Sequence, residues 1–103
     1  MPKTLTITIP HQLGKEAARQ RIDASIAQVF EPLGRLASVE RKQWAGDHLQ
    51  FGIQLASHRM DGRIDVAENQ VRIELDLPWL LATLGERVKG AIQKRGQILL
   101  EKK

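Results

Sequence analysis

Residues 49–77 read LQFGIQLASHRMDGRIDVAENQVRIELDL, and apolar side chains recur in this stretch at every second position. The alternation is strict in residues 49–55 and 71–77, and a shorter piece of it covers residues 60–66. A period of two places apolar side chains on one face of a β-strand and polar side chains on the other. We therefore predict three consecutive strands here, with a hairpin loop at residues 67–70. Together with the strand before them they make four consecutive strands that form an antiparallel meander.

The residues before this stretch predict a further strand and a helix. Residues 4–9 alternate and are rich in β-branched side chains, a pattern typical of a strand, and Pro10 ends it. Spacings of three and four then mark a helical stripe, which predicts a helix that Gly14 caps and that ends between Val29 and Gly34. The stripe consists of Ala18, Ile22, Ile26, Val29, Phe30 and Leu33.

A more polar strand and a second helix complete the predicted elements. Residues 36–44 form a weak strand pattern, and the polar run 40–43 is typical of an edge strand. In the fourth strand, Gly62 indicates a bulge or a close approach of another group to the backbone. Pro78 suits the first position of a helix. The residues that this helix would bury are Leu81, Leu84, Val88, Ile92 and Leu99.

Two features of the second helix allow alternative interpretations. Gly85, Gly90 and Gly96 each weaken a helix by about 1 kcal/mol relative to alanine, but small residues also let a helix lie close to a sheet or to a second chain. Arg95 falls on the apolar stripe. Either its head group reaches out of the core edge, or the helix bends near one of the last two glycines.

These elements predict an α+β fold in the order β-α-β-β-β-β-α. Each helix has one apolar stripe and the sheet has one apolar face. We therefore expect a two-layer sandwich, with both helices on the same face of a five-stranded, mostly antiparallel sheet. The opposite face would carry polar side chains into solvent. With 103 residues the chain has the length of a single domain, which we place over residues 1–103.

Composition narrows the class of protein. No apolar run approaches the roughly 20 residues of a membrane-spanning helix. The first residues lack the apolar core of a secretion signal, so we expect a cytoplasmic protein. The chain contains no cysteine, which excludes disulfides, thiolate nucleophiles and cysteine-based zinc sites.

The net charge of +4 comes from the C-terminal segment. Residues 1–78 contain ten Lys or Arg and ten Asp or Glu, whereas residues 79–103 contain six Lys or Arg and two Glu. A basic helix can attract an anionic partner, although cations also favour the C-terminal end of a helix because of its dipole. The candidate partner or anion surface consists of Trp79, Arg87, Lys89, Lys94 and Arg95.

No motif of an active site or a metal centre stands out. His11, His48 and His58 lack a second ligand at helical spacing, which favours surface or capping roles. Four carboxylates on neighbouring strands could supply an acid–base pair, but arginines alternate with them and favour cross-strand ion pairs instead. We expect no catalytic residue, no cofactor and no metal. The four carboxylates are Asp61, Asp65, Glu74 and Asp76.

Nucleic acid is disfavoured as a partner in spite of the basic charge. Sheets that bind RNA stack bases on aromatic side chains of the exposed face. Of the aromatic residues here, Phe30 and Phe51 are expected in the core, and Trp44 and Trp79 at the ends of elements. A stacking platform is therefore missing.

Four short motifs follow one another along nearly the whole chain, from Leu5 to Leu99. They are His11-x-Leu13 with Glu16-Ala17; Trp44-x-Gly46-Asp47-x-Leu49-x-Phe51; Gly62-x-Ile64; and Val71-x-Ile73-x-Leu75-x-Leu77-Pro78-x-Leu80-Leu81. In order and spacing they resemble the polyhydroxyalkanoic acid system proteins, a bacterial family of small proteins. The resemblance implies a link to storage-polyester metabolism and a granule-associated or regulatory role, and it carries over no catalytic residue.

Three hypotheses of function follow. The leading one is a non-catalytic accessory protein that associates with a polyhydroxyalkanoate granule or with its coating proteins. It would bind through apolar contact at Trp79 and Leu80 and through attraction of the helix cations to anionic coat components. The second is a small-ligand-binding protein of the helix-grip kind, an analogy of fold alone. The third is a protein-interaction module that forms a homodimer through the polar sheet face or an exposed edge.

Overall fold

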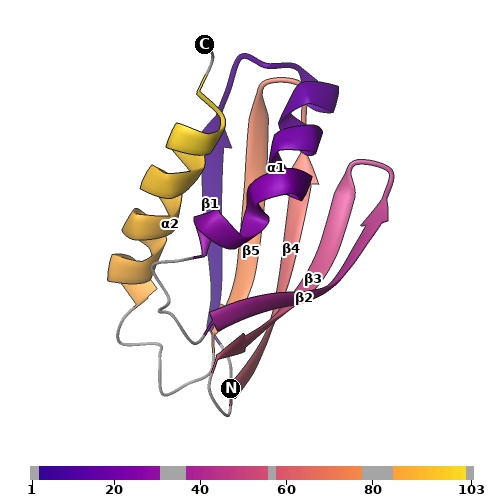
Figure 1. Ribbon diagram of the computed structural model, residues 1–103. Helices are drawn as coiled ribbons and strands as arrows, with labels where there is room; N and C mark the ends of the chain where they lie inside the picture. The colour runs from indigo at the N-terminus through magenta and orange to yellow at the C-terminus, as the bar shows by residue number, and fades with distance from the viewer. Residues whose placement is uncertain (1–2, 31–36, 56–57, 78–84, 102–103) are drawn as a thin grey trace.

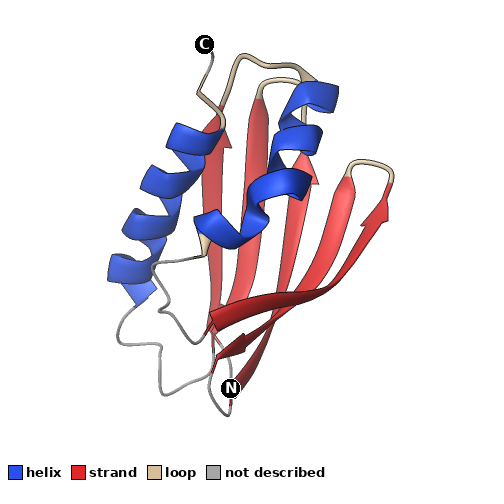
Figure 2. Ribbon diagram, in the orientation of Figure 1, coloured by secondary structure: helices blue, strands red, loops and turns tan. Residues whose placement is uncertain are grey.

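The computed structural model describes residues 3–30, 37–55, 58–77 and 85–101. The α+β class and the predicted order of elements are confirmed, and both helices lie on one face of the sheet (Figure 1, Figure 2). The elements are β1 (Lys3–Pro10), α1 (Lys15–Val29), β2 (Ala37–Ala45), β3 (His48–Leu55), β4 (His58–Val66), β5 (Gln70–Leu77) and α2 (Gly85–Leu99).

The five strands form one sheet in the order β1-β5-β4-β3-β2, and every pairing is antiparallel. β1, whose place the sequence does not fix, pairs with β5 in unbroken register from Lys3↔Leu77 to Pro10↔Gln70. β2 forms the other edge, as its polar residues predict. One extra residue lies in β2 between the pairs Glu40↔Gly52 and Gln43↔Gln50, which makes a β-bulge.

The core lies between the helices and the face of the sheet that the alternation predicts to be apolar. Leu5, Ile7 and Ile9 of β1 are buried there with alternate residues of β3, β4 and β5. The rings of Phe30 and Phe51 lie with their centroids 5.2 Å apart. From the predicted stripe of α1, all members are buried except Leu33, which lies outside the described residues. The buried members are Ala18, Ile22, Ile26, Val29 and Phe30.

Both ends of α1 agree with the prediction. Gly14 precedes the helix with φ 82°, and its carbonyl accepts a 3.1 Å hydrogen bond from the Ala18 N–H. A positive φ favours glycine at this position because it has no Cβ. The helix departs from regular geometry at Ser25 (φ −136°, ψ 24°) and ends at Val29.

The described part of α2 begins at Gly85, so the predicted helix start at Pro78 and the predicted contacts of Leu81 and Leu84 lie outside the described residues. Ile92 is fully buried, and Val88 and Leu99 pack partly against the core.

Arg95, which falls on the predicted apolar stripe of α2 if the helix is straight, does not enter the core. Arg95 is exposed, and the next residue, Gly96, is buried in its place. A Cβ added at Gly96 would collide with Ile9 Cδ1 of β1. The glycine therefore lets α2 approach β1 closely, which was one of its two predicted roles.

Candidate functional site

The predicted partner surface lies only partly within the described residues. Trp79 is outside them. Arg87, Lys94 and Arg95 are exposed on α2, and Lys89 is half-buried. Because successive helical residues are separated by about 100°, Lys89 and Arg95 flank the buried stripe on opposite sides, whereas Arg87 and Lys94 share the outward side. The four cations therefore do not form one cluster.

A smaller surface on α2 remains, which we call the α2 outer face: Arg87, Lys94 and Ile98. Spacings of seven and four place the three side chains on one side of the helix. Ile98 is 59 % exposed, and among the described residues it is the exposed large apolar side chain. Ile98 is not part of the predicted partner surface, because apart from Trp79 that surface is defined by charge. The helix that carries this face lies alongside β1, at one edge of the sheet (Figure 1).

The C-terminal end of α2 is held by a residue of α1. Arg21 Nη1 donates hydrogen bonds to the main-chain oxygens of Leu99 (3.2 Å) and Glu101 (2.6 Å). The last carbonyls of a helix lack partners inside the helix, so an arginine there supplies donors and a favourable charge. This contact fixes the end of α2 that carries Ile98.

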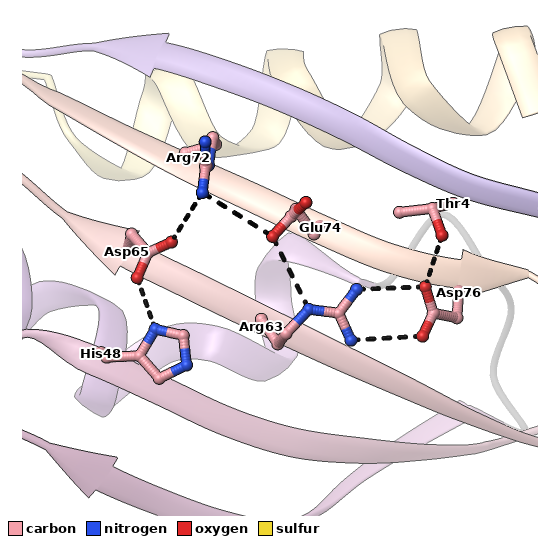
Figure 3. A network of polar contacts seen from close by, with 7 residues as sticks. All are labelled: Thr4, His48, Arg63, Asp65, Arg72, Glu74 and Asp76. Atoms are coloured by element: carbon pink, nitrogen blue, oxygen red, sulfur yellow. Dashed lines mark hydrogen bonds and ion pairs between the residues drawn. The ribbon is translucent and has the colours of Figure 1, made fainter.

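The exposed face of the sheet, the side away from the helices, carries a ladder of charged side chains (Figure 3). Arg63 in β4 donates hydrogen bonds of 3.2 and 3.1 Å to the two carboxylate oxygens of Asp76 in β5. It also lies 3.6 Å from Glu74, and Thr4 of β1 donates a 2.8 Å hydrogen bond to Asp76. The hydrogen bonds from Arg63 hold the pKa of Asp76 below its usual range, and the same contact raises the pKa of Arg63.

The ladder continues towards the β2–β3 hairpin. Arg72 contacts Asp65 at 3.2 Å and Glu74 at 3.9 Å, and the ring of His48 contacts the same Asp65 carboxylate through Nδ1. The hydrogen bond with His48, followed by that from Arg72, lowers the pKa of Asp65. The predicted cross-strand ion pairs are thus present in this part of the sheet.

The prediction of a surface or capping role is wrong for His11, because its ring is buried and no side chain caps the start of α1. The Leu13 N–H donates to Nδ1 of His11 at 3.2 Å, and Nε2 lies 3.1 Å from the Ala67 carbonyl. This pattern assigns the proton to Nε2 of a neutral imidazole, since Nδ1 accepts. The ring therefore joins the start of α1 to the β4–β5 hairpin. Among the described residues, no group of three or more potential ligands could hold a metal ion.

Hollows in the described residues lie at the surface. Two overlapping ones, of about 220 and 240 Å³, lie beside Gln50 and Asp61 on the exposed face of the sheet. Another, of about 130 Å³, lies between α1 and β2, where Trp44 donates a 2.9 Å hydrogen bond to Asp23. Arg19 lies over the Trp44 ring, 4.9 Å from its centroid.

Comparison with known proteins identifies a family that covers nearly the whole chain. A family model described as "Putative polyhydroxyalkanoic acid system protein" matches residues 5–100. No curated protein matches the chain. Among solved structures, the crystal structure of TTHA0849 from Thermus thermophilus is similar over 95 % of this chain and 92 % of that one, with 10 % sequence identity and a TM-score of 0.37. A score this low supports no argument about fold or function.

In the part of the chain that the structure describes, neither helix has the length and apolar character needed to cross a lipid bilayer.

Proposed function

This chain belongs to the family of polyhydroxyalkanoic acid system proteins, and from that premise we propose that it is a non-catalytic accessory protein of polyhydroxyalkanoate storage. In this proposal it associates with the polyester granule or with the proteins that coat it. The observation that carries the proposal is the α2 outer face, on which an exposed Ile98 lies on the same side of the helix as Arg87 and Lys94.

The physical route combines apolar contact with electrostatic attraction. A helix that displays an apolar side chain beside cations binds an apolar surface with an anionic coat, because each basic residue near such a surface contributes about 1 kcal/mol. Packing of Gly96 on Ile9 and the hydrogen bonds from Arg21 hold α2 on the domain. A rigid helix loses little conformational entropy when it binds. Additional apolar contact from Trp79 and Leu80 remains a prediction.

The small-ligand alternative of the helix-grip kind receives less support. Such a protein needs a cavity between the helices and the sheet. In the described residues that space is filled by apolar side chains, with Phe30, Ile53 and Ile92 among those with almost no exposed surface. The accessory role requires no such cavity.

Fractionation of granule-forming cells tests the proposal. The wild-type protein is expected with the granules, and the double variant Arg87→Gln/Lys94→Gln is expected to lower the granule-bound ratio by about tenfold or more. The matched control is Arg59→Gln/Lys15→Gln, which removes the same charge from other exposed positions and is expected to leave the ratio unchanged. A wild-type protein found wholly in the soluble pool of cells that contain granules would contradict the proposal.

The variant Ile98→Ser separates the two parts of the attraction. It keeps both cations of the α2 outer face and removes the exposed apolar side chain, so we expect partial release from granules. If Ile98→Ser and the wild type bind equally, apolar contact at this residue is excluded and the route above is wrong in that part.

A further inference from the structure

The β-bulge in β2 directs one arginine onto the exposed face of the sheet. Arg41, the residue after the pair Glu40↔Gly52, has φ 55°, a backbone region that few residues other than glycine adopt. Bulges commonly redirect a side chain in this way. The Arg41 guanidinium lies over Gly52 of β3, where an added Cβ would collide with its Nη2 atom. The missing side chain at Gly52 thus provides the space that Arg41 occupies.

Arg41 lines the smaller of the two overlapping hollows, of about 220 Å³, which shares Gln50 and Asp61 with the hollow of about 240 Å³. Their rim offers several hydrogen-bond donors and one exposed carboxylate. Arg63 is already held by Asp76 and Glu74, so its guanidinium has a fixed position at the rim. The polar side chains of the rim are Arg41, Gln43, Gln50, Asp61 and Arg63.

The Arg41 guanidinium is available for exchange. Its contact with Asp61 spans 3.7 Å, and the two side chains are 53 % and 72 % exposed. Ion pairs of this kind contribute little, because water screens them and two long side chains must be ordered. A carboxylate from a ligand can therefore replace Asp61 at Arg41, with the two-pronged geometry that guanidinium groups favour.

We propose that this hollow binds a short hydroxycarboxylate, with the ligand carboxylate on Arg41 and the ligand hydroxyl donating to Asp61. The amides of Gln43 and Gln50 supply further donors for the carboxylate or for an ester carbonyl. The choice of ligand rests on the proposed function, since hydroxycarboxylates are the units of a polyhydroxyalkanoic acid. A phosphate dianion fits less well, because Asp61 and Glu40 both adjoin Gly52 in the register and would repel it.

Titration of the purified, isotope-labelled protein with 3-hydroxybutanoate, followed by NMR, tests the inference. We expect shifts of the Gly52 backbone amide and of the Gln43 and Gln50 side-chain amides. Arg41→Gln is expected to weaken binding about tenfold, because it removes the charge-assisted contact with the ligand carboxylate. Arg59→Gln, on the same face but outside the hollow, is the matched control and is expected to bind as the wild type does.

A second variant keeps the arginine and moves it. Gly52→Ala places a methyl group where the Arg41 guanidinium lies, and the flexible end of that side chain can yield without unfolding the sheet. Binding is therefore expected to weaken, while the circular dichroism spectrum stays that of the wild type. Butanoate, which lacks the hydroxyl, and the methyl ester of the ligand, which lacks the carboxylate, are each expected to bind several-fold more weakly.

Three results would overturn the inference: shifts that map away from the hollow, equal binding by Arg41→Gln and the wild type, or equal binding of butanoate and 3-hydroxybutanoate. The assay contains no granules, and Arg87→Gln/Lys94→Gln is expected to bind the ligand normally. A failure at the hollow is therefore distinguishable from a failure of granule association through α2.

Discussion

The ring of Phe51 in β3 lies directly against Gly62, its register partner in β4, so closely that a Cβ at Gly62 would collide with three ring atoms. This contact is the close approach that a glycine inside the fourth strand predicts. Gly62→Ala must push a buried ring that also packs on Phe30. We expect a loss of about 1–3 kcal/mol in the free energy of unfolding, measured by urea denaturation.

Gly90→Ala is the same substitution at a site where we expect the opposite effect on stability. Gly90 lies inside α2, is exposed, and has no atom near the place where a Cβ would be added. Alanine favours the helix, so we expect a gain of about 0.5–1 kcal/mol in the same urea experiment. A loss at Gly90, or no effect at Gly62, would show that the described packing of the two glycines is wrong.

Acid is expected to weaken the fold through the charge ladder. The pKa values of Asp65 and Asp76 are lowered in the folded protein, chiefly by hydrogen bonds with His48 and Arg63. Their contribution to stability is fully present above the unfolded pKa of about 3.9, and it is lost as the pH falls through the lower folded pKa. The free energy of unfolding should therefore fall between about pH 5 and pH 2.

Asp76→Asn tests the part of this acid dependence that comes from one carboxylate. The variant should lose about 1 kcal/mol at neutral pH, where the hydrogen bonds from Arg63 matter most, and should depend less on pH below about 5. Equal profiles for Asp76→Asn and the wild type would contradict the assignment.

Arg21→Ala is expected to loosen the end of α2 without unfolding the protein. The hydrogen bonds of Arg21 to Leu99 and Glu101 are lost, so amide hydrogens in the last turn of α2 should exchange several-fold faster. Arg19→Ala removes a neighbouring arginine that contacts Trp44 instead, and it should leave exchange in that turn unchanged. Unaltered exchange in Arg21→Ala would show that this cap is not needed.

The strands β1, β4 and β5 could be predicted from the sequence because their burial alternates. Residues 71–77 are buried at every second position in the structure, as the pattern requires. The polar run 40–43 likewise predicted an edge, since charged side chains are tolerated where one side of a strand stays unpaired. These are local signals, and they determine the element order and the buried face.

Contacts between distant residues could not be predicted in this way. The sequence does not mark Gly96 as the residue of α2 that meets Ile9, because glycine has no apolar side chain to indicate a contact. The cap by Arg21, the turn of Arg41 onto Gly52 and the ring of His11 on Ala67 each depend on tertiary placement. Among the site residues, the cross-strand ion pairs carried a local signal in the alternation of opposite charges. Arg87 and Lys94 carried one in the excess of basic residues near the C-terminus.

Co-sedimentation of the purified protein with isolated polyhydroxyalkanoate granules, measured at increasing sodium chloride concentration, tests the central claim most directly. We expect the wild type to pellet with granules at low salt. Salt should progressively release it, because the attraction is partly electrostatic. The variant Arg87→Gln/Lys94→Gln should pellet much less. A wild-type protein that stays in the supernatant at low salt, or a double variant that pellets as well as the wild type, would contradict that claim.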